Sequence, residues 1–292
     1  MADLEHVMLT KAVPLTVITG YLGAGKTTLI NRMLRQASAP FAVIVNDLGA
    51  LPVDAALISA EAASTLTLTL TNGCACCQLQ SDLSAQLTQL RQAGFGAVVL
   101  EASGVAKATN LVSITSQADG YQLAKIITLV DATAVPRLME DRYLTGVVVE
   151  QIKAGDSVYQ TKAGPEITPS LLALRADARF LSSEGQLPVD IDPYHLIERS
   201  ASAKTVAVTP QFQHRVVYPK TSLQPESLKV FIDRSPAVQR VKGWLVVESG
   251  TYLIQATRDR FVAQPAAGNH GAGLQFIWQG TEALDFSSIT QE

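Results

Sequence analysis

Residues 13–36, VPLTVITGYLGAGKTTLINRMLRQ, carry the pattern that decides the fold. A short run rich in β-branched residues is followed by glycines and then by an amphipathic helical pattern. Between them, Gly20–Thr27 reads GYLGAGKT and fits the phosphate-loop pattern G-x-x-x-x-G-K-[ST] in the strand-to-helix context that it requires. The stretch therefore predicts a nucleotide-binding P-loop, and the alternative is a glycine-rich turn with an exposed lysine.

The residue types in this loop suit the chemistry of phosphate groups. Glycines allow successive backbone N–H groups to face the β-phosphate, and the start of the helix adds its positive dipole end. We expect Lys26 to reach the β- and γ-phosphate oxygens and the Thr27 hydroxyl to bind Mg²⁺.

Further short apolar runs follow the P-loop: FAVIVN, TLTLTLT, GAVVLEAS and KIITLVDA. Helical patterns lie between several of them, and we expect one helix to begin at a capping Ser81. The alternation predicts an α/β domain with a mostly parallel sheet, residues 1–200. Beyond it the runs TVAVTPQFQHRVVYP, VKGWLVVES, TYLIQATRDRFVA and LQFIWQG predict a smaller α+β domain, residues 201–292.

Two strand ends carry polar residues that a P-loop enzyme needs. The run AVVLEASG leads to Glu101, a candidate ligand for Mg²⁺, and Gly104 follows it. The run VIVNDLG ends in Asn46 and Asp47, where a loop that senses the nucleotide would lie. The alternatives are a solvated carboxylate and a plain turn.

All three cysteines of the chain lie in TNGCACCQLQ, residues 71–80, as Cys74, Cys76 and Cys77. Thiolates at this spacing can offer two or three sulfurs to one soft or borderline ion such as Zn²⁺ or Cu(I). A set of fewer than four protein ligands suits metal transfer, because structural zinc sites are closed by four. The alternatives are buried, inert cysteines and a redox site.

Composition narrows the class of protein. The net charge of −3 and the pI near 5.8 argue against a nucleic-acid partner. The longest apolar runs are far too short to span a membrane, and the N-terminal residues do not have the pattern of a signal peptide. We expect a cytoplasmic protein with reduced thiols and no membrane partner.

In order and interval, the segments GYLGAGKTT, VNDLG, NGCACC and LEASG resemble the CobW-type P-loop GTPases. These are metallochaperones related to the nickel-insertion GTPases that serve hydrogenase and urease. The resemblance implies GTP or GDP, Mg²⁺ and a transition metal, most simply Zn²⁺, as ligands. It covers most of the chain, and the C-terminal segments QRVKGWLVV and LQFIWQG are similar to the family's small C-terminal domain.

The resemblance also implies roles for single residues. Catalytic roles would fall to Lys26, Glu101 and Asp47, and magnesium binding to Thr27 and Glu101. The transition metal would be held by Cys74, Cys76 and Cys77. The nucleotide would be bound by Gly20, Gly23, Ala24, Gly25, Lys26, Thr27, Thr28, Asn46, Gly104, Thr161 and Lys162.

The chain departs from the family pattern in three places. Its first sensing loop reads Asn-Asp-Leu-Gly-Ala at residues 46–50, where the family usually has Asn-Glu-Phe-Gly-Glu. Its base-reading loop keeps Thr161 and Lys162 but has Gly164 where the family has an aspartate that accepts from guanine. It has four scattered histidines instead of a histidine-rich stretch.

Together these features favour a GTP-hydrolysing metallochaperone that binds zinc at the C-x-C-C motif and delivers it to a client metalloprotein. A nucleotide- and metal-binding regulator with weakened catalysis is the alternative that Gly164 and Ala50 favour. A small-molecule kinase would leave the cysteines without a role. The sequence leaves open the metal, the client and whether the chain forms a homo-oligomer.

Overall fold

The structure is a computed structural model of the 292-residue chain. The structure describes residues 12–37, 39–46, 67–70, 76–105, 118–141, 144–162, 164–195, 212–248, 250–258, 260–266, 271–280 and 283–290. The described residues form two compact units, one within residues 12–195 and one within residues 212–290. The proposed boundary at residue 200 lies between them, outside the described residues.

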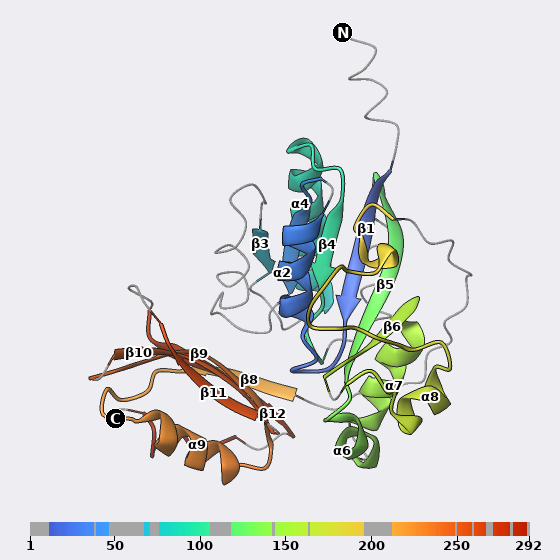
Figure 1. Ribbon diagram of the computed structural model, residues 1–292. Helices are drawn as coiled ribbons and strands as arrows, with labels where there is room; N and C mark the ends of the chain where they lie inside the picture. Colours follow the sequence, from blue (N-terminus) through green and yellow to red (C-terminus); the bar gives the residue numbers. More distant parts are fainter. Residues whose placement is uncertain are drawn as a thin grey trace. The chain divides into compact units, whose positions relative to one another are not determined.

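The first unit is built on a seven-stranded sheet with the strand order β3-β2-β4-β1-β5-β6-β7 (Figure 1). All its pairings are parallel. The strands are β1 (Val13–Thr19), β2 (Ala42–Asn46), β3 (Thr67–Leu70), β4 (Val98–Glu101), β5 (Tyr121–Asp131), β6 (Ser157–Thr161) and β7 (Arg179–Phe180). The helices are α2 (Lys26–Gln36), α4 (Cys76–Gln92), α6 (Val135–Glu140), α7 (Thr145–Ala154) and α8 (Pro169–Leu174), with a 3₁₀ turn at Val189–Ile191.

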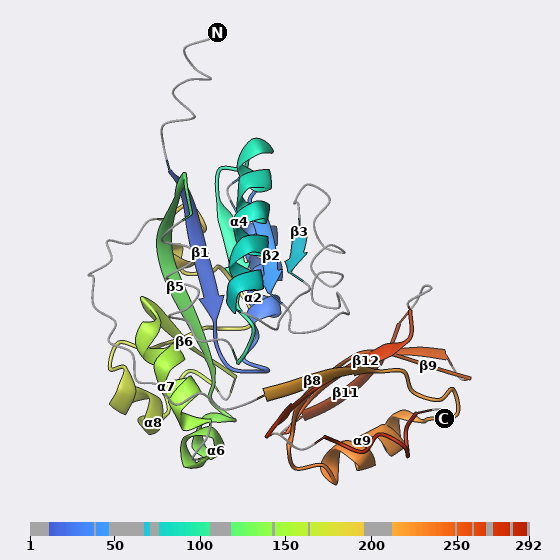
Figure 2. The same ribbon diagram turned by 180° about the vertical axis from the view of Figure 1, so that it is seen from behind.

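Helices cover both faces of this sheet because successive side chains of a strand point to opposite sides. On β1, Ile18 packs in one core with Leu29 and Met33 of α2. The preceding residue, Val17, packs in a second core with Leu87 of α4. Helix α2 accordingly lies in front of the sheet in Figure 1, and α4 lies in front of it in Figure 2. The predicted α/β architecture is confirmed.

Helix α4 begins at Cys76, so the expected start at Ser81 is wrong. The leucine spacing explains the difference, because Leu79 continues the helical repeat of Leu83, Leu87 and Leu90 towards the N-terminus. Cys76 and Cys77 are therefore the first two residues of this helix.

The second unit is an antiparallel sheet with the order β11-β10-β9-β12-β8. Its strands are β8 (Phe212–Val217), β9 (Val238–Val247), β10 (Gly250–Thr257), β11 (Arg260–Pro265) and β12 (Gly273–Gln279), and its helix is α9 (Pro225–Asp233). The core includes Leu228 and Ile232 of α9 together with a group of aromatic rings around Phe286. The expected smaller α+β fold is thus present. Among the helices that the structure describes, none is long and apolar enough to cross a membrane.

Candidate nucleotide-binding site

The P-loop lies where the carboxyl end of β1 turns into α2. Gly20 has a φ of 138°, and a Cβ at this position would lie 2.3 Å from the backbone oxygen of Leu129 in β5. Only glycine allows the loop to leave the sheet this close to its neighbouring strand. Gly25, with a φ of 97°, is the residue at which the loop turns into the helix.

Lys26 is buried, and its side chain folds back over the loop. Its Nζ donates to the backbone oxygen of Gly20 at 2.9 Å and to that of Tyr21 at 3.4 Å. A buried ammonium group inside this loop is well suited to bind phosphate oxygens, because it is a compact point charge. The structure thus places a cation inside the predicted phosphate loop.

The Thr27 hydroxyl at the start of α2 contacts the Glu101 carboxylate at the end of β4. Parallel pairing sets Ile18 of β1 opposite Glu101 of β4, so the end of β4 faces the start of α2. Thr27 Oγ1 donates to Glu101 Oε1 at 3.1 Å and lies 3.3 Å from Oε2. Glu101 is 3% exposed. Hydroxyl and carboxylate oxygens are ligands that Mg²⁺ prefers, so this pair fits the expected magnesium site.

The predicted base-reading segment, Thr161 at the end of β6 and Lys162 directly after it, also contacts the P-loop. Thr161 Oγ1 donates to the backbone oxygen of Ala24 at 3.0 Å, and Lys162 Nζ donates to that of Gly23 at 3.1 Å. Lys162 also forms an ion pair with Asp131 at the end of β5. Asp131 is a site residue that was not predicted, although it follows the apolar part of the run KIITLVDA just as Glu101 follows that of AVVLE.

Gln160 fixes the rest of this segment with its side-chain amide. Its Nε2 donates to the backbone oxygens of Gly164 at 3.3 Å and Glu166 at 2.7 Å, and its Oε1 accepts from the N–H of Thr168 at 2.9 Å. Gly164 has a φ of 93°, and a Cβ built there would meet nothing within 4 Å. The position at which the expected aspartate is missing is therefore surrounded by open space.

Gly104 packs directly on the P-loop. A Cβ at this position would lie 2.8 Å from the backbone nitrogen of Leu22 and 3.0 Å from its Cα. The two predicted phosphate-facing segments therefore touch, and a larger residue at 104 would force them apart.

Several predicted site residues cannot be placed. Asp47 and Cys74 lie outside the described residues. Asn46 ends β2, and Cys76 and Cys77 begin α4, but the structure does not describe their side chains. Thr28 is exposed on α2. Within the described ranges, no group of three or more His, Cys, Asp or Glu residues could hold a metal ion. The metal site thus stays a prediction.

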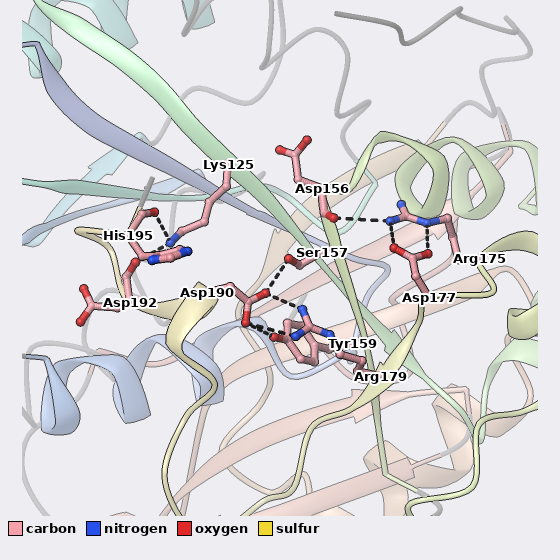
Figure 3. A network of polar contacts seen from close by, with 10 residues as sticks. All are labelled: Lys125, Asp156, Ser157, Tyr159, Arg175, Asp177, Arg179, Asp190, Asp192 and His195. Carbon is pink, nitrogen blue, oxygen red and sulfur yellow. Dashed lines mark hydrogen bonds and ion pairs between the residues drawn. The ribbon is translucent and has the colours of Figure 1, made fainter. Parts of the chain in front are cut away.

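A second polar network joins β6 to the segment that follows β7 (Figure 3). Asp190 accepts hydrogen bonds from Ser157 Oγ and Tyr159 OH, both at 2.6 Å, and pairs with Arg179 at 2.5 Å. Burial opposes ionisation of Asp190, but these donors hold the pKa of its carboxyl below the usual value. Burial, and then the bond to Asp190, raise the pKa of Tyr159. These bonds hold the segment after β7 against β6.

Lys125 belongs to the same network and is fully buried. Its Nζ donates to the backbone oxygen of His195 at 2.7 Å and to that of Asp192 (Figure 3). Burial lowers the pKa of Lys125 to about 8, although the carboxylates of Asp190 and Asp192 act against the shift. A lysine within the apolar run LAKIITLV was the sequence signal for this contact. Lys125 precedes Asp131 by six residues, which is about 20 Å along β5. We therefore assign this network a role in stabilising the fold and not in binding the nucleotide.

Comparison with known proteins extends these observations. Residues 14–166, just over half of the 292-residue chain, match the family model described as CobW/HypB/UreG, nucleotide-binding domain. The chain is similar to the zinc chaperone CobW of Pseudomonas aeruginosa, with 29% identity over 210 residues, 61% of this chain and 55% of that protein. It is similar to the zinc chaperone YjiA of Escherichia coli, with 33% identity over 161 residues, 51% of this chain and 49% of that protein.

Among solved structures, the zinc-bound form of a triple mutant of the YjiA GTPase is similar to this chain with a TM-score of 0.45 and 19% identity, covering 93% of this chain and 95% of that one. The chain spans about half the length of the two curated relatives. The family match covers residues 14–166, which contain the P-loop, Glu101 and the predicted base-reading segment.

Proposed function

The chain belongs to the CobW/HypB/UreG family, and from this premise we propose that it is a GTP-dependent metallochaperone. In this proposal it binds a transition metal, most simply zinc, at Cys74, Cys76 and Cys77, and GTP hydrolysis controls release of the metal to a client protein. The names of its relatives, zinc chaperone in both cases, support the metal and the class of function.

The observation that carries the nucleotide part is that the segments at the ends of β4 and β6 both contact the P-loop. Lys26 lies within the P-loop, Glu101 faces Thr27, and the segments around Gly104 and Thr161 contact the backbone of residues 22–24. Parallel pairing brings the carboxyl ends of β4, β1, β5 and β6 to the same edge, where nucleotides bind in open α/β sheets.

Each group has a definite task in this proposal. Lys26 neutralises charge on the phosphate oxygens, and Thr27 and Glu101 hold Mg²⁺, which supplies further charge neutralisation when it is bound. Lys162 packs along the base while its ammonium group is held by Gly23 and Asp131. The metal is cargo in this scheme, and thiolates bind it better as pH rises because protons compete for the sulfurs.

The test is a zinc titration of the whole chain in GTP·Mg²⁺ and in GDP·Mg²⁺, with a competing chelator that reports zinc affinity. We expect the affinity to differ between the two nucleotides and each of Cys74→Ser, Cys76→Ser and Cys77→Ser to weaken it. Lys26→Ala should remove the nucleotide dependence and keep the zinc site. Lys153→Ala, on the exposed side of α7, is the matched control. Equal zinc affinity in both nucleotides would leave a metal site but contradict a chaperone gated by GTP.

The second candidate is a nucleotide- and metal-binding regulator that turns over GTP slowly or not at all. The open position at Gly164 favours it, because no side chain there reads guanine. Phosphate release from GTP and from ATP, measured over several turnovers with and without zinc, separates the two. Release at the background rate in every condition would favour the regulator.

A further inference from the structure

The buried side of α7 contains one polar residue, Gln151, which is 1% exposed. The other buried positions of this helix are apolar, namely Val147, Val148, Ile152 and Ala154. A buried amide is costly unless its hydrogen bonds are made, so its partners indicate why it is there.

The amide of Gln151 reaches the loop after β4. Its Nε2 donates to the backbone oxygen of Gly104 at 3.2 Å, across 47 residues of sequence. Gln151 also lines the same small cavity as Tyr21, Leu22 and Ala24 of the P-loop. The side chain therefore lies beneath the P-loop and holds the neighbouring segment at one point.

The helix that carries this amide is itself fixed to the sheet. Thr128 Oγ1 of β5 donates to the backbone oxygen of Gln151 at 2.8 Å. A Cβ at Gly155, directly after α7, would lie 2.5 Å from the same Thr128 oxygen, so the end of the helix rests closely on β5. Gln151 thus extends from a rigid support to a loop whose backbone packs against Leu22.

We propose that Gln151 is a positioning residue that holds the Gly104 peptide against the P-loop and so favours binding of a nucleoside triphosphate over a diphosphate. The inference rests on the proposed function, in which Glu101, three residues before Gly104, holds the Mg²⁺ that bridges the β- and γ-phosphates of a bound triphosphate. The amide acts through the Gly104 carbonyl and does not touch the nucleotide. Because a diphosphate has no γ-phosphate, loss of the amide affects its binding far less.

The test compares the affinities of the whole chain for a non-hydrolysable GTP analogue and for GDP, by competition with a fluorescent nucleotide in Mg²⁺. Gln151→Met keeps the size of the side chain and removes the donor. We expect the dissociation constant for the GTP analogue to rise about tenfold, because a buried carbonyl loses its partner, and that for GDP to change less than about twofold. Gln151→Asn, whose shorter side chain draws the amide away from Gly104, should show the same selective loss and serves if the methionine variant does not fold.

Thr128→Val is the matched control, because it removes a hydrogen bond to the Gln151 backbone oxygen and leaves the Gly104 contact of the side-chain amide in place. This variant should raise the dissociation constants of the GTP analogue and of GDP by the same factor, or leave both unchanged. Equal losses for both nucleotides in Gln151→Met, or no loss, would overturn the inference and leave Gln151 a packing residue. Lys26→Ala separates this failure from that of the proposed function, since normal GTP binding by Lys26→Ala would remove the P-loop assignment itself.

Discussion

Replacing Lys125 with methionine should change how the stability of the first unit depends on pH. The ammonium group is fully buried and donates to the backbone oxygens of Asp192 and His195. Burial lowers its pKa from 10.5 to about 8, and the carboxylates of Asp190 and Asp192 offset only part of that shift. The folded protein therefore binds the Lys125 proton less tightly than the unfolded chain does.

The sign and size of the effect follow from this difference. Between pH 8 and about 10.5 the unfolded chain carries the proton and the folded state has lost it, so the free energy of unfolding rises with pH. A shift of about 2.5 units at 1.36 kcal/mol per unit corresponds to about 3 kcal/mol. The cost of burying the charge is fully present below pH 8 and is gone above pH 10.5. Methionine has no proton to lose, so the variant lacks this contribution.

The measurement is urea unfolding of wild type and Lys125→Met from pH 7.5 to pH 10.5 with a thiol reductant, followed by circular dichroism. Tryptophan fluorescence would report on the second unit and not on the unit that contains Lys125, because Trp244 and Trp278, the two tryptophans, both lie in the second unit. The difference in unfolding free energy, wild type minus variant, should grow by about 3 kcal/mol across this range. Lys153→Met, which removes an exposed lysine, should run parallel to wild type. A Lys125→Met curve that also runs parallel would refute the reasoning.

Three further predictions concern the nucleotide site. Glu101→Gln keeps the shape beside Thr27 but removes the charge, so the Mg²⁺ concentration needed for half-maximal nucleotide binding should rise at least about tenfold; an unchanged requirement would exclude Glu101 as a ligand. Gly104→Ala should weaken binding of GTP by about tenfold or more in a competition assay, because its Cβ would lie 2.8 Å from the Leu22 nitrogen; normal affinity would show that the two segments separate at little cost. Gly164→Asp should raise the preference for GTP over ITP, which lacks only the 2-amino group, by about tenfold. The control is Gly164→Ala, which has the same backbone strain at a φ of 93° but no carboxylate. An equal change in the preference for GTP over ITP in both variants would show that the aspartate does not recognise the guanine base.

The residues from 13 to 36 were enough to predict the order strand, P-loop, helix, because each signal in them is local. The glycine spacing, the lysine and the helical repeat all lie within 24 residues. The predicted meeting of Thr27 and Glu101 required only that β4 lie beside β1 in a parallel sheet. Such contacts follow from strand ends, which the sequence marks with a polar residue after an apolar run.

Contacts made through long loops were not predictable in this way. Asp190 is 31 residues from Tyr159, and Lys125 contacts backbone oxygens 67 and 70 residues away. The sequence around Lys125 does not predict which segment of the chain covers this side chain. Gln151 poses the same problem, since its amide looks like an ordinary helix residue until the fold brings Gly104 to it. Sequence reasoning can detect a buried polar residue in an apolar pattern, but it cannot name the partner.

The strand order limits how the cysteines could sense the nucleotide. Cys76 begins the helix that follows β3, and the order β3-β2-β4-β1 puts three strand intervals between β3 and the strand that leads into the P-loop. At about 4.8 Å per interval, the ends of β3 and β1 are separated by roughly 14 Å. We propose that coupling in the chaperone passes through the end of β2, which lies between β3 and β4: Val45 pairs with Glu101, and Asn46 pairs with Leu70. A substitution at Asn46 should accordingly alter the nucleotide dependence of zinc affinity while each ligand alone still binds, and an Asn46→Ala variant with unaltered coupling in the zinc titration would exclude this route.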